Sequence, residues 1–179
     1  MKTKTSKEIK NLVAAAVCLA LCMVLPLLTG QVPQVGARLA PMHIPVLLCG
    51  FIAGPVFAAA VGLIAPLLRF SIFGMPPLMP TAVAMTFELA MYGLAAGFLY
   101  MMLPKKIPFV YVSLIVAMLA GRVVWGIARW VIGIVIGPPF SLQMFMAGAF
   151  INAVPGIILH IVLIPIIVMA LRKAKLLAE

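Results

Sequence analysis

Long apolar runs separated by short Pro- and Gly-bearing stretches constrain this chain more than any other feature. A helix needs about 20 apolar residues to cross the hydrocarbon core of a bilayer, and such runs recur between residues 11 and 171. Hydrophobic residues make up 66% of the chain and charged residues 9%, against about 45–50% and about 25% in soluble domains. The sequence therefore predicts an integral membrane protein. It excludes a soluble enzyme, a disordered chain and a nucleic-acid-binding module.

We divide the apolar runs into six predicted transmembrane helices within one all-α domain that covers residues 1–179. The run at 43–70 is too long for one straight span, and Gly54 and Pro55 break it into two short or tilted helices. The other boundaries fall in stretches that carry Pro, Gly or polar residues. The predicted spans are 11–28, 43–54, 56–70, 81–103, 108–136 and 142–171.

The distribution of basic residues favours this even number of spans. The chain has 13 Lys and Arg residues against three acids. Cytoplasmic loops carry the excess of Lys and Arg, so we expect both termini in the cytoplasm of a bacterial cell. The basic N-terminus also resembles a secretory signal peptide, but the multispan remainder favours a retained first span. Nine basic residues fall on one face: Lys2, Lys4, Lys7, Lys10, Lys105, Lys106, Arg172, Lys173 and Lys175.

Polar side chains inside the spans are candidate functional residues, because a charge in the bilayer is costly unless it is paired or hydrated. Glu88 is the only acid within a predicted span. Counted from the outer helix ends, Glu88 and Arg129 lie about 10 Å deep and Asn152 about 15 Å deep. Arg122, Trp125 and Arg129 follow one another at i, i+3 and i+7, which places them on one helical stripe. Three helices are therefore expected to contribute to one polar layer.

Two interpretations of this layer are open. In the first, a Glu88–Arg129 ion pair holds two helices together. In the second, Glu88, Arg122, Trp125, Arg129 and Asn152 line a substrate pocket that opens outward. One carboxylate does not neutralise two arginines, so the surplus positive charge suits an anionic or strongly hydrogen-bonding ligand.

We expect structural roles for the remaining polar residues and for the cysteines. His43 is expected at the outer surface, and Arg69 is expected to reach the interface from the outer end of its helix. His160 has no second His or carboxylate in register, so we expect no metal site. The three cysteines lack paired spacing and are expected to be small core residues: Cys18, Cys22 and Cys49.

Small residues four positions apart allow helix backbones to approach closely. The pattern occurs at Ala16 and Ala20, at Gly93 and Gly97, and at Gly133 and Gly137. We expect most of these pairs to pack within the chain, whereas the first is a candidate docking face for a partner. No nucleotide-binding loop, HExxH motif or Ser/His/Asp set is present, so we expect neither an enzyme nor a cofactor.

Four segments carry a resemblance to a known family. They are Met42-His-Ile-Pro-Val-Leu-Leu-Cys-Gly50, Gly62-Leu-Ile-Ala-Pro-Leu-Leu-Arg69, Phe73-Gly-Met-Pro-Pro-Leu-Met-Pro-Thr81 and Phe87-Glu-Leu-Ala-Met-Tyr-Gly93. Together they resemble the substrate-binding S component of energy-coupling factor (ECF) transporters, which import vitamins and micronutrients in bacteria.

The resemblance implies a partner as well as a substrate. An S component binds its vitamin from outside and associates with an ECF module of two cytoplasmic ATPases and a transmembrane coupling protein, where ATP hydrolysis drives inward release. In this family an Ala-x-x-x-Ala pattern on the first helix contacts the coupling protein, and Ala16 and Ala20 match it. The pocket is lined by the last three helices and closed by outer loops, which here are residues 29–42 and 71–80. The candidate substrates are pantothenate, which the two arginines favour slightly, α-ribazole and forms of vitamin B6.

Three other functions compete with this interpretation. A solitary proton-coupled secondary transporter would use Glu88 as its proton carrier. A non-transport membrane scaffold would need only the Glu88–Arg129 pair. An intramembrane enzyme would need a catalytic set, which the sequence does not offer.

Overall fold

The fold is entirely helical over the part of the chain that the structure, a computed structural model, describes: residues 2–28, 33–137, 139–174 and 176–177. This agrees with the predicted all-α class. The helices are α1 (Lys2–Leu28), α2 (Pro33–Leu39), α3 (His43–Ala53), α4 (Pro55–Phe73), α5 (Val83–Met102), α6 (Ile107–Ile136), α7 (Leu142–Met146) and α8 (Val154–Lys173). Two distorted helical turns, η1 (Leu78–Ala82) and η2 (Ala147–Ile151), lead into α5 and α8.

Five helical stretches among the described residues are long and apolar enough to cross a membrane: Thr5–Leu28, Pro55–Phe73, Leu78–Met102, Ile107–Ile136 and Leu142–Lys173. They correspond to five of the six predicted spans. The span predicted at 43–54 is α3, whose 11 residues extend only about 16 Å, roughly half of the hydrocarbon core. The chain is therefore a multi-pass membrane protein in which one apolar helix is short.

The break predicted at Gly54 and Pro55 separates α3 from α4. Gly54 has a φ of 88°, a conformation that costs glycine little because it has no Cβ. Pro55 begins α4, where its missing N–H is not needed for a helical hydrogen bond. The two residues together let α4 follow α3 without an intervening loop.

A second break divides the span predicted at 142–171. The distorted turn η2 ends at Ile151, and α8 begins at Val154 with Pro155 in its first turn. Pro155 has no N–H to donate to the carbonyl one turn earlier, which favours a break in the helix at this point. The sixth predicted span is thus a short outer segment followed by α8.

Glycines allow the backbones of α4 and α5 to approach each other closely. A Cβ at Gly62 would lie 2.4 Å from the backbone carbon of Leu89, and one at Gly93 would lie 2.6 Å from that of Ala58. A Cβ at Gly97 would lie 2.6 Å from the nitrogen of Pro55. The predicted small-residue pair at 93 and 97 therefore packs within the chain, as small residues do between membrane helices.

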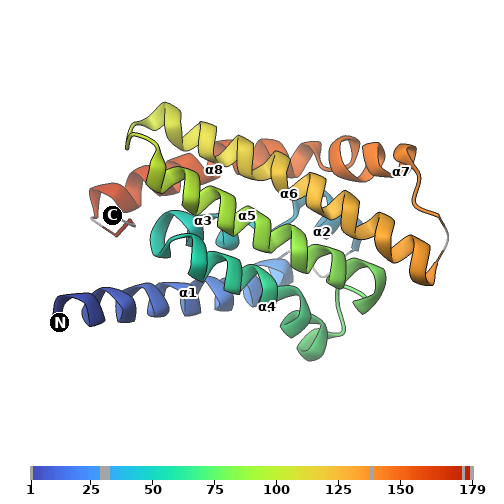
Figure 1. The fold of residues 1–179 in the computed structure, drawn as a ribbon, viewed down its shortest axis with the longest axis horizontal. Helices are drawn as coiled ribbons and strands as arrows, with labels where there is room; N and C mark the ends of the chain where they lie inside the picture. The colour runs from blue at the N-terminus through green and yellow to red at the C-terminus, as the bar shows by residue number, and fades with distance from the viewer. Residues whose placement is uncertain (1, 29–32, 138, 175, 178–179) are drawn as a thin grey trace.

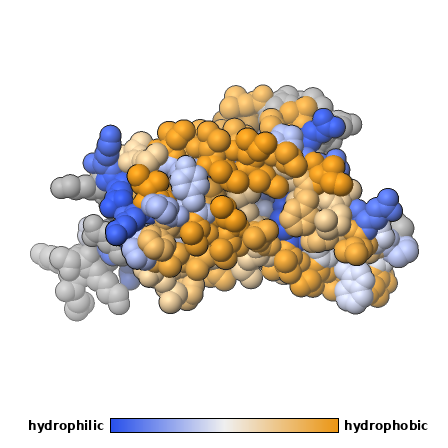
Figure 2. Space-filling model, turned by 90° about the horizontal axis from the view of Figure 1, so that it is seen from above, coloured by the Kyte–Doolittle hydropathy of each residue, from blue (hydrophilic) through white to orange (hydrophobic). Residues whose placement is uncertain are grey.

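The long helices run side by side, and α1 lies along one edge of the bundle (Figure 1). The start of α1, the turn between α5 and α6, and the end of α8 all lie at one end of the long axis (Figure 1). The α4–η1 and α6–α7 connections lie at the other end, which we call the outer end. Figure 2 shows an apolar surface between hydrophilic groups that gather mostly at the two ends.

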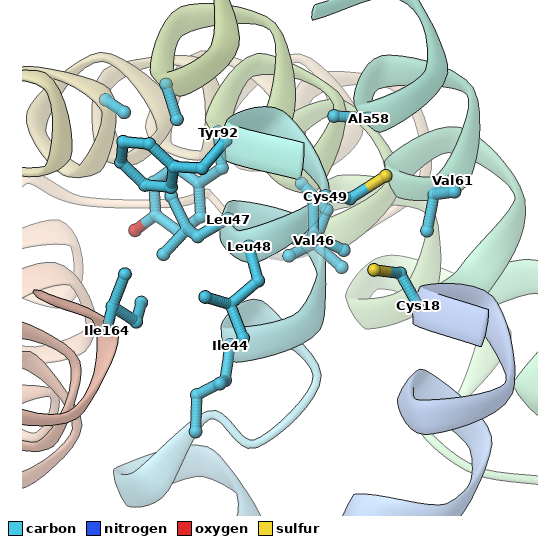
Figure 3. Close-up of a cluster of buried hydrophobic side chains, with 14 of the residues drawn as sticks. Cys18, Ile44, Val46, Leu47, Leu48, Cys49, Ala58, Val61, Tyr92 and Ile164 are labelled. Carbon is cyan, nitrogen blue, oxygen red and sulfur yellow. The ribbon is translucent and has the colours of Figure 1, made fainter. Parts of the chain in front are cut away.

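The core centres on α3, whose side chains are almost all buried. Figure 3 shows Cys49 of α3 on the side of Cys18 and Val61, and Leu47 on the other side of α3, next to Tyr92. All three cysteines are buried and free. They are therefore small core residues, as predicted.

Arg69 differs from its prediction, because it does not reach the interface. Its side chain is only 3% exposed, and its Nη1 donates a 2.6 Å hydrogen bond to the carbonyl of Met23 on α1. The guanidinium also lies 4.9 Å from the centre of the Phe73 ring. Arg69 thus ties α4 to α1 near the outer end of the bundle.

Candidate functional site

Glu88 forms the buried ion pair of the bundle, and its partner is Arg122. The Nη1 atom of Arg122 on α6 donates a 2.8 Å hydrogen bond to Oε1 of Glu88 on α5. The side chains are 2% and 12% exposed, respectively. The hypothesis of a Glu88–Arg129 ion pair is therefore wrong, because Glu88 pairs with Arg122 instead. Helix α6 has 30 residues, about 45 Å, which is longer than the hydrocarbon core is thick, so a residue's distance from the end of α6 does not give its depth in the bilayer.

His43 lies beside this ion pair and not at the outer surface, where the sequence suggested it. Its Nε2 lies 3.4 Å from Oε1 of Glu88, and its ring meets that of Tyr92 edge-on at 5.1 Å. On its other side it stacks on His160 with ring centroids 6.0 Å apart. His160 therefore has a second histidine beside it, contrary to expectation. We call His43, Glu88, Tyr92, Arg122 and His160 the central polar cluster.

The turn between α2 and α3 brings His43 to this position. Ala40 has a positive φ of 47°, which is uncommon for a residue with a side chain, and its carbonyl accepts a hydrogen bond from the N–H of His43. A Cβ at Gly156 would lie 2.6 Å from the carbonyl oxygen of Arg38. The absence of a side chain at Gly156 thus lets the end of α2 lie directly against α8, one turn before His160.

Several polar atoms of the central polar cluster are buried without a hydrogen-bond partner in the described part of the chain. They are both ring nitrogens of His43, the Tyr92 hydroxyl, Nε of Arg122 and Nε2 of His160. Each such group costs about 1–3 kcal/mol, and native proteins contain few of them. Their concentration in one place makes the central polar cluster a candidate binding site.

A second group of residues lies further along α6, toward the outer end. The guanidinium of Arg129 lies 5.3 Å from the ring centre of Phe140 and 6.0 Å from that of Trp125. Trp125 contacts Phe140 and Phe145, with ring centroids 5.6 Å and 6.2 Å apart. Nε of Arg129 is also buried without a partner. Trp125 and Arg129 thus belong to an aromatic group that adjoins the central polar cluster on α6.

This aromatic group interlocks α6 with the outer segment of the last span. A Cβ at Gly126 would lie 2.5 Å from the ring of Phe145, and one at Gly148 would lie 2.7 Å from the ring of Trp125. The rings of Phe145 and Trp125 therefore fit against Gly126 and Gly148, where any larger residue would clash with them. The two contacts hold α6 against α7 and η2.

A small apolar hollow lies between α6 and α8. Its volume is about 70 Å³, and its lining includes Met118, Phe150, Ile161 and Arg122. Arg122 is the residue that it shares with the central polar cluster. The hollow therefore offers space for an apolar group next to the cluster.

The structure does not bring every predicted site residue into the buried cluster. Asn152 is exposed at the break between η2 and α8. Of the loop predicted at 29–42, residues 29–32 lie outside the described residues, and the rest forms α2 and the turn that positions His43. The loop predicted at 71–80 holds the end of α4 and the start of η1.

The sequence prediction missed His43, Tyr92 and His160. Tyr92 follows Glu88 by four residues, which places both on one face of α5, so its position was available from spacing. Both histidines lie in apolar segments, where an ionisable residue is a functional candidate by default. Among the described residues, no group of three His, Cys, Asp or Glu side chains could hold a metal ion.

Comparison with known proteins gives one match. A family model described as ECF transporter, substrate-specific component, matches residues 10–170. No curated protein and no solved structure matches the chain.

Proposed function

The chain belongs to the family of ECF transporter substrate-specific components, and from this we propose that it is the high-affinity binding subunit of an ATP-driven importer for a small water-soluble vitamin or cofactor precursor. The candidate ligands are pantothenate, α-ribazole and forms of vitamin B6. Binding subunits of this kind are not themselves enzymes; ATP hydrolysis belongs to the module that they join.

One observation carries the location of the binding site. Five polar side chains from α3, α5, α6 and α8 meet inside the bundle, and buried atoms of four of them lack hydrogen-bond partners. A pure scaffold would gain stability from apolar residues at these positions, because unpaired buried polar groups are costly. A hydrogen-bonding ligand would satisfy these atoms. The hollow beside Arg122 would take an apolar part of the same ligand.

The proposed topology has six passes with both termini in the cytoplasm. Both ends of the described chain lie at the end of the bundle that carries the turn between α5 and α6 (Figure 1), where Lys105 and Lys106 lie. That end is cytoplasmic by the positive-inside rule. In this arrangement α2 and α3 together return the chain from the outer end to Gly54, which makes up for the short length of α3.

The proposed partner is an ECF module of two cytoplasmic ATPases and a transmembrane coupling protein. Helix α1 packs mainly on α3 and α4, and its other side is uncovered. Ala16 and Ala20 are both exposed on that side, together with Val13 and Val17. A stripe of small residues flanked by exposed valines suits close approach of a partner helix.

The test is thermal unfolding of the purified protein in nanodiscs against a panel of water-soluble vitamins and their precursors. At 100 times its Kd, a specific ligand adds about 2.7 kcal/mol of stability. We expect one clear hit. In His43→Phe, which keeps an aromatic ring against Tyr92 and His160 but removes both nitrogens, the stabilisation should disappear.

A control variant and two contrary outcomes complete this binding experiment. Glu8→Gln alters the exposed acid on α1 and should leave the hit unchanged. Stabilisation by no compound of the panel would contradict vitamin capture and favour a scaffold. Uptake of the hit by proteoliposomes that lack the ATPases would instead favour a solitary transporter.

A further inference from the structure

We infer that Arg129 is the anion-binding residue of the site, and that the ligand carries a carboxylate or phosphate group. This inference rests on the proposed function and narrows its substrate class. It starts from the finding that Arg122 and Arg129, which look equivalent in the sequence, have different electrostatic surroundings in the fold.

The charge of Arg122 is compensated, whereas that of Arg129 is not. Glu88 accepts the hydrogen bond from Arg122 at 2.8 Å and is the only acid within the bundle core. Of the two other acids, Glu8 lies near the start of α1, at the opposite end of the bundle (Figure 1), and Glu179 lies outside the described residues. No ion pair of Arg129 occurs among the described residues.

The surroundings of Arg129 strengthen the case for an anionic partner. Its Nε is buried and has no hydrogen-bond partner among the described residues, and its guanidinium lies near the rings of Phe140 and Trp125. A ring face offers a cation about 0.5–2 kcal/mol but accepts no conventional N–H hydrogen bond from the guanidinium fork. Carboxylate and phosphate oxygens match that fork with two parallel hydrogen bonds.

The position of Arg129 orients such a ligand. Arg129 lies seven residues beyond Arg122 on α6, about 10 Å closer to the outer end. A ligand that arrives from outside therefore meets the uncompensated cation first and afterwards the central polar cluster, in which Glu88 compensates Arg122. The ligand should thus have its anionic group outward and its hydroxyl, amide or apolar groups inward.

Two sources supply the same anionic oxygens: a soluble substrate and the phosphate of an anionic lipid. The experiment separates them by using matched pairs of probes in nanodiscs of defined lipid. The pairs are pantothenate with panthenol, and pyridoxal 5′-phosphate with pyridoxal, and the members of each pair differ mainly in the anionic group. Nanodiscs of phosphatidylcholine alone are compared with nanodiscs that contain phosphatidylglycerol.

In phosphatidylcholine nanodiscs we expect the anionic member of one pair to bind about 10–100-fold more tightly than its neutral partner, the range for a hydrogen-bonded charge. Arg129→Gln should reduce that ratio to about 1 by weakening only the anionic member. Arg38→Gln changes an exposed arginine near the outer end and should keep the full ratio. The unfolding temperature of each ligand-free variant shows that it has folded.

Each other outcome has a defined meaning. A second outcome is that phosphatidylglycerol stabilises the protein without any soluble probe and that Arg129→Gln abolishes this stabilisation. That outcome supports anion binding at Arg129, with a lipid as the source of the anion. Equal binding of the neutral and anionic members in the wild-type protein overturns the inference and leaves the proposed function intact. If no vitamin binds and Arg129→Gln changes no measurement, both the inference and the proposed function are overturned.

Discussion

Glu88 is the residue whose surroundings bear most directly on both stability and binding. It is almost fully buried, it pairs with Arg122, and it contacts His43. An ion pair taken out of solvent recovers its desolvation cost only while both partners are present. The stability of the bundle and the polarity of the site therefore depend on the same carboxylate.

At the residue scale, we predict that Glu88→Gln destabilises the protein by about 3–5 kcal/mol, because it leaves Arg122 as an uncompensated buried charge. Thermal or denaturant unfolding in detergent measures the loss. The double variant Glu88→Gln/Arg122→Met should recover part of it, since both charges are then absent. Glu8→Gln is the matched control, and an equal effect of the two Gln substitutions would contradict the prediction.

Helices α4 and α5 form the most closely packed pair of elements, and glycine determines their separation. At Gly62 the backbone of Leu89 occupies the space that a side chain would need. Because the obstacle is backbone and not the end of a flexible side chain, the helices must separate to accommodate even a methyl group.

We accordingly predict that Gly62→Ala destabilises the protein by about 1–3 kcal/mol through overpacking, which an unfolding transition in detergent measures. Gly137→Ala is the control, because a Cβ at Gly137 would meet nothing within 4 Å. Unchanged stability of Gly62→Ala would mean that α4 and α5 are further apart than the structure has them.

Helix α1 packs on α3 and α4 with one side and exposes apolar residues on its other side. We predict that Ala16→Trp reduces co-purification with the ECF module by about tenfold or more, since a loss of about 1.4 kcal/mol of binding is a factor of ten. Ligand stabilisation of the isolated subunit should not change. Val56→Trp, at a 75% exposed position on α4, is the control for bulk on a lipid-facing surface. Full assembly of Ala16→Trp would place the docking surface elsewhere.

At the scale of the whole molecule, different helix connections lie at the two ends of the bundle. The turn between α5 and α6, which contains Lys106, lies at the same end as the start of α1 and the end of α8, and the connection between α6 and α7, which contains Ser141, lies at the other end (Figure 1). The proposed six-pass topology assigns these ends to opposite sides of the membrane.

A labelling experiment tests this assignment. In a background without the three native cysteines, we predict that a membrane-impermeant maleimide labels Ser141→Cys on intact cells. Lys106→Cys should react only after the membrane is permeabilised. Labelling of both positions from outside would exclude the proposed topology.

The sequence alone determined the properties that add up locally along the chain. Hydropathy is a sum over about 20 neighbouring residues, so the membrane class and the positions of five long helices were predictable. The break at Gly54 and Pro55 was also predictable locally, because glycine permits backbone conformations that interrupt a helix and proline lacks the N–H that continues one. The placement of Glu88, Arg122 and Arg129 within long apolar helices followed directly from the predicted spans.

Only the tertiary structure decided which of these side chains meet. Depth counted from helix ends assigned Arg129 to Glu88, but the length of α6 brings Arg122 to that level. The positive φ of Ala40 and the close contact at Gly156 place His43 between Glu88 and His160. Rotation about a helix axis, tilt and relative height depend on packing against neighbours that are distant in sequence. The composition of the central polar cluster, and the lack of an acidic partner for Arg129, are therefore properties of the folded bundle.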